Sequence, residues 1–60
     1  MKPKEAIEHY KSRVMLAATL QVTEQTVKNW LAKDKIPYSA QLAIQLLTKG
    51  KLKANKDDCI

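Results

Sequence analysis

A short stretch near the middle of the chain carries side chains that can read the edges of nucleic-acid bases. Gln25 and Asn29 have amides that can bond adenine N6 and N7 in a bidentate way, and Lys28 can donate to guanine O6 and N7. The three lie within four residues of one another, so a single helical face can present them together. This pattern predicts direct readout in the major groove of a DNA duplex.

The neighbours of these three residues fit a role on DNA in different ways. Glu24 is repelled by phosphate, but it is tolerated if it accepts from cytosine N4 or pairs with Lys28 four residues later. The second role is also that of an ordinary solvated ion pair on a helix surface. Four basic residues flank the stretch and are candidates for phosphate contacts: Lys11, Arg13, Lys33 and Lys35.

Two ring side chains allow a functional role but are better explained without one. Trp30 could stack on a base, yet its spacing with Val27 and Leu31 is that of a buried helix face. His9 has no carboxylate or thiol partner at useful spacing, which favours a surface histidine. We therefore expect Trp30 in the core and His9 in solvent.

Apolar side chains recur at helical spacing along almost the whole chain. They predict an opening helix over about residues 3–10, and Ser12 is suited to cap a second helix of about two turns. Thr23 is suited to cap a third helix over about residues 24–33, where Glu24 favours the positive end of the helix. These signals indicate an all-helical fold.

The pattern continues into a fourth helix. Pro37 disfavours helix at the residue before it, and Ser39 is then suited to cap the next helix. Its apolar positions repeat at helical spacing and comprise Leu42, Ala43, Leu46 and Leu47. Gly50 is placed to close this helix in the left-handed conformation.

Residues 13–33 have the features of a helix-turn-helix. Two short helices that cross steeply need a small residue at their close approach, an apolar plug in the turn and an apolar residue behind it. Ala17, Val22 and Val27 occupy these places, and Leu20 and Trp30 complete the shared core. We therefore expect a single small all-α domain of four or five short helices, with this motif at its centre.

The string RVMLAATLQVTEQTVKNW, from Arg13 to Trp30, followed by an Ile-Pro loop and a closing helix, resembles the Cro-type repressors of lambdoid bacteriophages. The likeness is to their all-helical branch and extends over about residues 1–52. It implies a second motif helix in the major groove and protomers that pair on a pseudo-palindromic operator to block transcription. By position, the groove-facing residues are Thr23, Glu24, Gln25, Lys28 and Asn29, and Arg13 is a backbone contact.

One position departs from that family. The first residue of the turn is usually Gly, because the backbone there tends to be left-handed, and this chain has Gln21. A side chain in that conformation costs on the order of 1 kcal/mol. The turn can tolerate this cost.

Composition supports a polyanionic partner. The 60 residues hold eleven Lys plus Arg against six Asp plus Glu, a net charge of +5, which favours nucleic acid first and an anionic membrane second. No apolar run is long enough for a membrane span, so we expect a cytoplasmic protein without a membrane partner. The resemblance to phage repressors implies a bacterial host cell and a location at the nucleoid.

Nothing in the chain indicates catalysis or a bound cofactor. The single cysteine, Cys59, provides neither a disulfide nor a thiolate cluster for a metal. No nucleophile with an adjacent base and no phosphate-cradling Gly loop is present. We therefore expect no enzyme activity, no cofactor, no metal and no small-molecule ligand.

The domain is expected to span residues 1–50, and residues 51–60 are expected to form a flexible tail because they are mostly polar. A weak homodimer is also expected, at least on DNA. Four apolar residues either form a patch for this dimer or finish the core of the monomer: Ile36, Tyr38, Ile44 and Leu52.

The interpretation that these observations favour is a sequence-specific DNA-binding transcriptional repressor whose recognition helix spans about residues 24–33. Two alternatives stay open. An architectural or excision-type DNA-binding protein would tolerate many sequences and bend its site strongly. A small protein-interaction module such as an antitoxin would use its basic face on an acidic partner.

Overall fold

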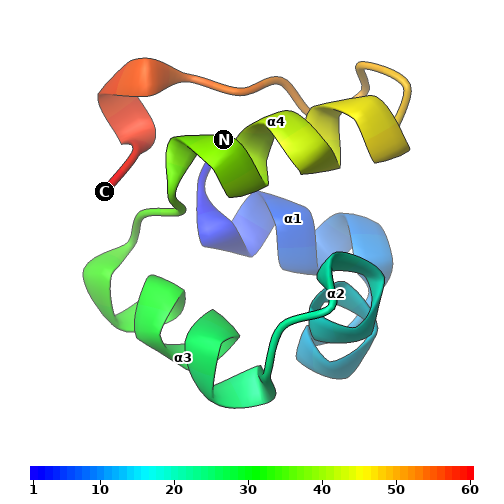
Figure 1. The fold of residues 1–60 in the computed structure, drawn as a ribbon, viewed down its shortest axis with the longest axis vertical. Coiled ribbons are helices and arrows are strands. Elements are labelled where there is room, and N and C mark those ends of the chain that lie inside the picture. The colour runs from blue at the N-terminus through cyan, green and yellow to red at the C-terminus, as the bar shows by residue number, and fades with distance from the viewer.

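Four α-helices and one short 3-10 helix make up the structure, a computed structural model that describes residues 1–60. The elements are α1 (Pro3–Tyr10), α2 (Arg13–Leu20), α3 (Glu24–Lys33), α4 (Tyr38–Leu47) and η1 (Lys56–Asp58), with no strand. The predicted all-helical fold is confirmed. In Figure 1, α1 lies between α4 above and α2 and α3 below.

Two of the three predicted helix caps are confirmed. The Ser12 hydroxyl accepts a hydrogen bond from the backbone N–H of Met15 at 3.0 Å, at the start of α2. The Thr23 hydroxyl accepts from the backbone N–H of Thr26 at 3.2 Å, at the start of α3. Each hydroxyl thus satisfies one of the first N–H groups of its helix, which have no partner within the helix itself.

The third predicted cap, Ser39, is wrong, because the N-cap position is occupied two residues earlier by Pro37 and α4 begins at Tyr38. Pro37 makes no side-chain cap bond, but its backbone carbonyl accepts from the N–H of Gln41 at 3.0 Å. The proline ring holds φ at −54°, a value shared with helical residues, while ψ at 143° is extended, as is usual for an N-cap residue. The start of α4 is therefore set by proline geometry.

The core lies where α1, α2, α3 and α4 meet. It consists of the apolar residues Met1, Ala6, Leu16, Ala17, Val27, Trp30, Ile36 and Ile44. Trp30 is 6% exposed, which confirms its predicted core position, and Val22 is half-buried in the turn as the expected plug. Of the two alternatives left open for Ile36 and Ile44, the structure supports the second, because both are completely buried and finish the core of the monomer.

The buried face of α4 also differs from the expected apolar positions. The helix turns Gln41, Ile44 and Thr48 inward, whereas Leu42, Leu46 and Leu47 are exposed. Both inward polar side chains are satisfied: the Thr48 hydroxyl donates to the carbonyl of Ile44 at 2.8 Å, and Gln41 makes several hydrogen bonds described below. A polar side chain whose hydrogen bonds are made can be buried at little cost, so the apolar pattern alone misplaces this face.

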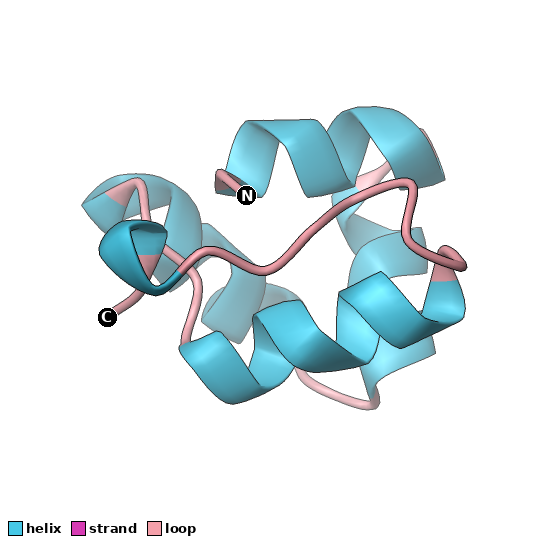
Figure 2. Cartoon of the chain, turned by 90° about the horizontal axis from the view of Figure 1, so that it is seen from above, coloured by secondary structure: helices cyan, strands magenta, loops and turns pink.

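Part of the segment expected as a flexible tail lies along α4. The N–H of Asn55 donates to Gln41 Oε1 at 2.8 Å, and Gln41 Nε2 donates to the carbonyl of Asp58 at 3.0 Å. The N–H of Ala54 donates to Gln45 Oε1 at 2.8 Å. Figure 2 shows this segment running across the helices before it enters η1. Residues of the predicted tail are therefore hydrogen-bonded to the helical domain.

The turn between α2 and α3 has the expected left-handed residue. Gln21 has φ 58° and ψ 41°, and the N–H of Val22 donates to the carbonyl of Ala17 at 2.9 Å. In Figure 1, α2 is seen nearly end-on and α3 lies across the view, so the two axes cross steeply. This elbow leaves one side of α3 free of the rest of the domain.

The strain at Gln21 leads to a testable expectation. Gln21→Gly should raise the free energy of unfolding by about 0.5 to 1 kcal/mol, because glycine adopts the left-handed region without a side-chain penalty. Chemical denaturation measures this change in the free energy of unfolding. Gly50→Ala is the matched control, since Gly50 has φ 84° and no atom within 4 Å of an added Cβ. That variant should lose about 1 kcal/mol through backbone strain alone. A loss of stability in Gln21→Gly would show that the Gln21 side chain itself supports the turn.

Candidate nucleic-acid interface

The outer side of α3 carries a row of polar side chains, and the opposite side of the helix is apolar and buried. Val27 and Trp30 anchor the helix in the core. The five residues predicted to contact bases are all exposed: Thr23, Glu24, Gln25, Lys28 and Asn29. Because these residues follow the helical repeat away from the anchored side, the helix presents them together to solvent.

Two of these side chains are bonded to each other. Gln25 Nε2 donates to Asn29 Oδ1 at 3.1 Å, across one turn of α3. At the start of the helix the hydroxyls of Thr23 and Thr26 lie 3.0 Å apart and share a hydrogen bond. The structure therefore brings Gln25 and Asn29 into direct contact and holds Thr23 at the N-terminus of the helix.

The charged pair on this surface is not joined. Both ion pairs of the structure are made by Lys2, so the carboxylate of Glu24 and the ammonium of Lys28 remain separate. A pair at this spacing contributes only about 0.3 to 0.5 kcal/mol when it forms. Both groups are thus available to a ligand.

The four predicted phosphate contacts lie on four different segments. Lys11 is the C-cap residue after α1, Arg13 begins α2, Lys33 is in the last turn of α3, and Lys35 follows in the loop. All four are exposed, and none is paired with an acidic group. Their charges are therefore not neutralised within the chain.

The one acidic residue between Lys33 and Lys35 is engaged elsewhere. The carboxylate of Asp34 lies 3.5 Å from Lys2 Nζ, and Lys2 Nζ also lies 3.3 Å from Asp58. The hydrogen bond with Asp58 is the main reason that the pKa of Lys2 is raised above its usual value. Lys2 thus offsets the negative charge that lies between Lys33 and Lys35 in the sequence.

Two further residues join the predicted ones in space. Lys4 lines an open hollow of about 490 Å³ with Arg13, Ser12 and Leu31. Ala32 is exposed and lies four residues after Lys28, on the same side of α3. The helical repeat from Gln25 through Lys28 leads directly to Ala32, and alanine at such a position can contact a thymine methyl group. The four-residue spacing from Lys28 could have identified Ala32 from the sequence, whereas no sequence pattern pointed to Lys4.

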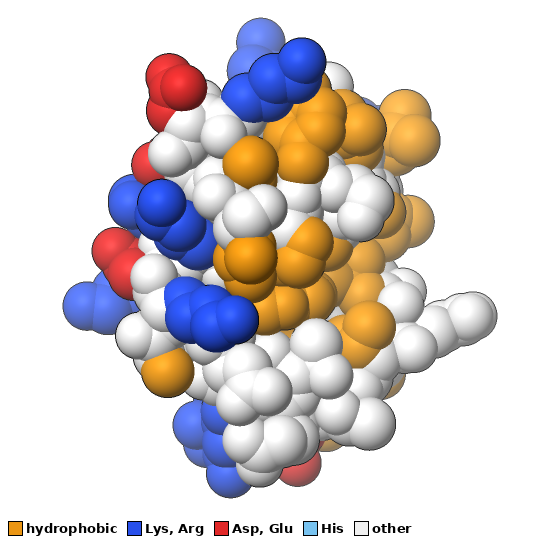
Figure 3. All heavy atoms as spheres, turned by 60° about the vertical axis from the view of Figure 1, so that its left-hand side comes forward, with side chains coloured by type: hydrophobic (Ala, Val, Ile, Leu, Met, Phe, Trp, Pro, Cys, Tyr) orange, Lys and Arg blue, Asp and Glu red, His pale blue; other side chains and the backbone are white.

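Charged and apolar side chains are segregated on the molecular surface. On the face drawn in Figure 3, apolar side chains gather in one broad area and Lys and Arg side chains lie along one edge of it. No group of three His, Cys, Asp or Glu side chains is arranged to hold a metal ion. None of the helices is of a length and hydropathy suited to crossing a membrane.

Comparison with known proteins agrees with this geometry. Residues 2–59 match the P22 Cro family model, described as DNA-binding transcriptional regulator Cro. The structure of N15 Cro complexed with consensus operator DNA is similar, with a TM-score of 0.84 and 34% sequence identity over 92% of this chain and 87% of that chain. No curated protein matches. Because the family model spans nearly the whole chain, this protein belongs to the Cro family of DNA-binding transcriptional regulators.

Proposed function

We propose that this Cro-family protein is a sequence-specific repressor that inserts α3 into the major groove of a pseudo-palindromic operator. The observation that carries the proposal is the outer side of α3, where two amides and an ammonium group are exposed on a helix anchored by Val27 and Trp30. The likeness to N15 Cro complexed with consensus operator DNA supports the same placement. Occupancy of the operator would exclude polymerase from the promoter.

The side chains divide into two roles. Gln25 and Asn29 together recognise adenine, Lys28 contacts guanine, and Glu24 accepts from cytosine N4, because these donor and acceptor patterns match in the major groove. Thr23 contacts the groove from the N-terminus of α3. The residues that hold the phosphate backbone and set the register are Lys11, Arg13, Lys33 and Lys35.

Two copies pair weakly on the operator, with half-sites about 34 Å apart. The exposed leucines of α4 offer apolar surface for this pairing, since Leu42, Leu46 and Leu47 are 40%, 79% and 54% exposed. Repression then depends on protein concentration. The protein works in the bacterial cytoplasm, at the nucleoid, and catalyses no reaction.

Selection from a library of random DNA duplexes tests the proposal. The expected result is an enriched inverted repeat whose half-sites are separated by about 10 base pairs from centre to centre. Binding to all duplexes with strong bending would instead support an architectural role. Failure to retain any duplex, together with binding to an acidic protein, would support an interaction module.

Two substitutions distinguish backbone contacts from base contacts. Arg13→Ala should weaken binding to all sequences alike and reduce the slope of log K against log salt by about one unit. Lys28→Ala, the matched loss of one positive charge, should cost about 1 to 3 kcal/mol on the operator and relax the choice of base at one position. Titrations of operator and random duplexes at several salt concentrations measure both. An unchanged slope in Arg13→Ala would remove Arg13 from the backbone contacts.

A further inference from the structure

Gln25 and Asn29 are joined before any DNA is present. The bond runs from Gln25 Nε2 to Asn29 Oδ1 at 3.1 Å, and both side chains are exposed on the outer side of α3. An exposed side chain of this kind normally samples several rotamers, and ordering it on binding costs affinity. A bond to a neighbour one turn away removes part of that cost in advance.

The bond also sets which atom of the Asn29 amide faces which way. Oδ1 points toward Gln25, and therefore toward the N-terminal end of α3, so Nδ2 is turned to the other side. After this bond Asn29 retains both N–H donors and one acceptor position on Oδ1. Those are the groups that a bidentate contact with adenine requires, an acceptor for N6–H and a donor for N7.

We propose that Gln25 is a positioning residue for Asn29, and that the hydrogen-bonded amide pair selects adenine over guanine as one unit. This inference rests on the proposed role of α3 in the major groove. Guanine presents two acceptors, O6 and N7, where adenine presents one donor and one acceptor. An Asn29 amide that is free to turn can direct its N–H groups to guanine, whereas an amide held by Gln25 keeps its oxygen in place for adenine N6.

The neighbouring lysine provides an internal comparison. Lys28 lies between the two residues in sequence and is exposed on the same side of α3, yet it has no hydrogen bond to either of them. Residues that share a hydrogen bond respond to substitution non-additively, and the coupling is weaker between neighbours that share no bond or partner. Stronger coupling is therefore expected between Gln25 and Asn29 than between Gln25 and Lys28.

A double-mutant cycle on the selected operator tests the proposal. Gln25→Met keeps the length of the side chain and removes the amide. Asn29→Ala should weaken binding by roughly 5- to 150-fold. Gln25→Met should weaken it by about 3- to 10-fold in the otherwise unaltered protein, but by less than about 2-fold when combined with Asn29→Ala. In the control cycle, the losses from Gln25→Met and Lys28→Ala should multiply to within about 2-fold.

The preference for adenine over guanine is a second readout, and it would not change if Gln25 only stabilised the fold. Gln25→Met should reduce the preference for adenine over guanine at the position that Asn29→Ala relaxes, while the melting temperature stays within about 4 °C. If the losses from Gln25→Met and Asn29→Ala multiply, Gln25 contacts a base independently and the proposal is overturned. The proposal is also overturned if Gln25→Met leaves the preference for adenine over guanine unchanged.

A measurement on the free protein separates this inference from the proposed function. Side-chain NMR couplings should show a single χ1 rotamer for Asn29 in the unaltered protein and averaged rotamers in Gln25→Met. Averaged couplings in the unaltered protein would overturn the positioning role even if the operator is bound specifically. A single rotamer, together with a failure to select any duplex, would leave the amide pair intact and overturn the role of α3 on DNA.

Discussion

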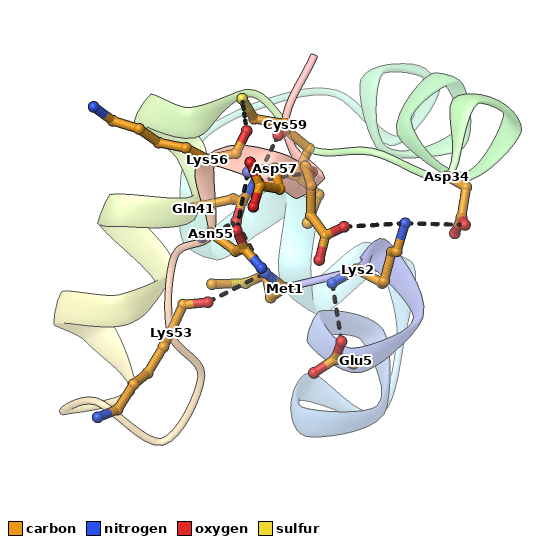
Figure 4. Close-up of polar contacts among 12 residues, drawn as sticks. Met1, Lys2, Glu5, Asp34, Gln41, Lys53, Asn55, Lys56, Asp57 and Cys59 are labelled. Carbon is orange, nitrogen blue, oxygen red and sulfur yellow. Dashed lines mark hydrogen bonds and ion pairs between the residues drawn. The ribbon is translucent and has the colours of Figure 1, made fainter.

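Gln41→Leu should lower the free energy of unfolding by about 2 to 4 kcal/mol, because the substitution leaves several buried or half-buried polar groups without partners. The Gln41 side chain is completely buried at the centre of a polar network drawn in Figure 4. Its amide donates to the carbonyls of Ile36 and Asp58 and accepts from the nitrogens of Met1 and Asn55. Leucine fills the same space but makes none of these bonds.

Thermal unfolding followed by circular dichroism measures this loss. For a chain of this size the expected decrease in melting temperature is roughly 10 to 25 °C. Gln45→Leu is the matched control, because Gln45 is on the same helix and its Oε1 accepts one hydrogen bond from this segment, from the N–H of Ala54 at 2.8 Å. It should lose only about 1 kcal/mol. Equal losses in the two variants would show that the network around Gln41 contributes no more than a single hydrogen bond.

Structural features that depend only on residues close together in the chain could be predicted from the sequence. The bounds of α3 and the Ser12 and Thr23 caps follow from spacing and hydroxyl groups, and the left-handed backbone at Gln21 was implied by the resemblance to Cro-type repressors. The same local signals predict a polar outer side of α3, since Val27 and Trp30 identify the inner one. The helix-turn-helix is therefore determined by residues that lie close together in the sequence.

Features that depend on distant partners could not be predicted. Gln41 bonds groups up to 40 residues away, and no spacing rule indicates that a glutamine will be buried. The folding back of residues 51–60 follows from that network, because glutamines of α4 bond their backbone groups. The contact between Gln25 and Asn29 is intermediate: the four-residue spacing permits it, but the structure is needed to show which amide donates.

Trp30→Ala should lower the free energy of unfolding by about 3 to 5 kcal/mol. A chain of 60 residues has a total of roughly 3 to 9 kcal/mol, so most of the population is expected to unfold at 37 °C. The reason is geometric, since Trp30 is 6% exposed and is packed in one cluster with Ala17, Val27 and Ile36. Its removal leaves a cavity where α2, α3 and the following loop meet.

Far-ultraviolet circular dichroism during urea titration measures the loss, and Trp30→Phe is the control because it keeps an aromatic ring in the same site. We expect Trp30→Phe to stay folded and to bind the operator with nearly unchanged affinity, since the indole does not contact DNA in the proposed arrangement. A Trp30→Ala variant that unfolds at the same urea concentration as the unaltered protein, yet no longer binds, would place Trp30 on the interface. It would also mean that the outer side of α3 has been assigned to the wrong residues, because a helix cannot direct Trp30 and Lys28 to the same base pairs.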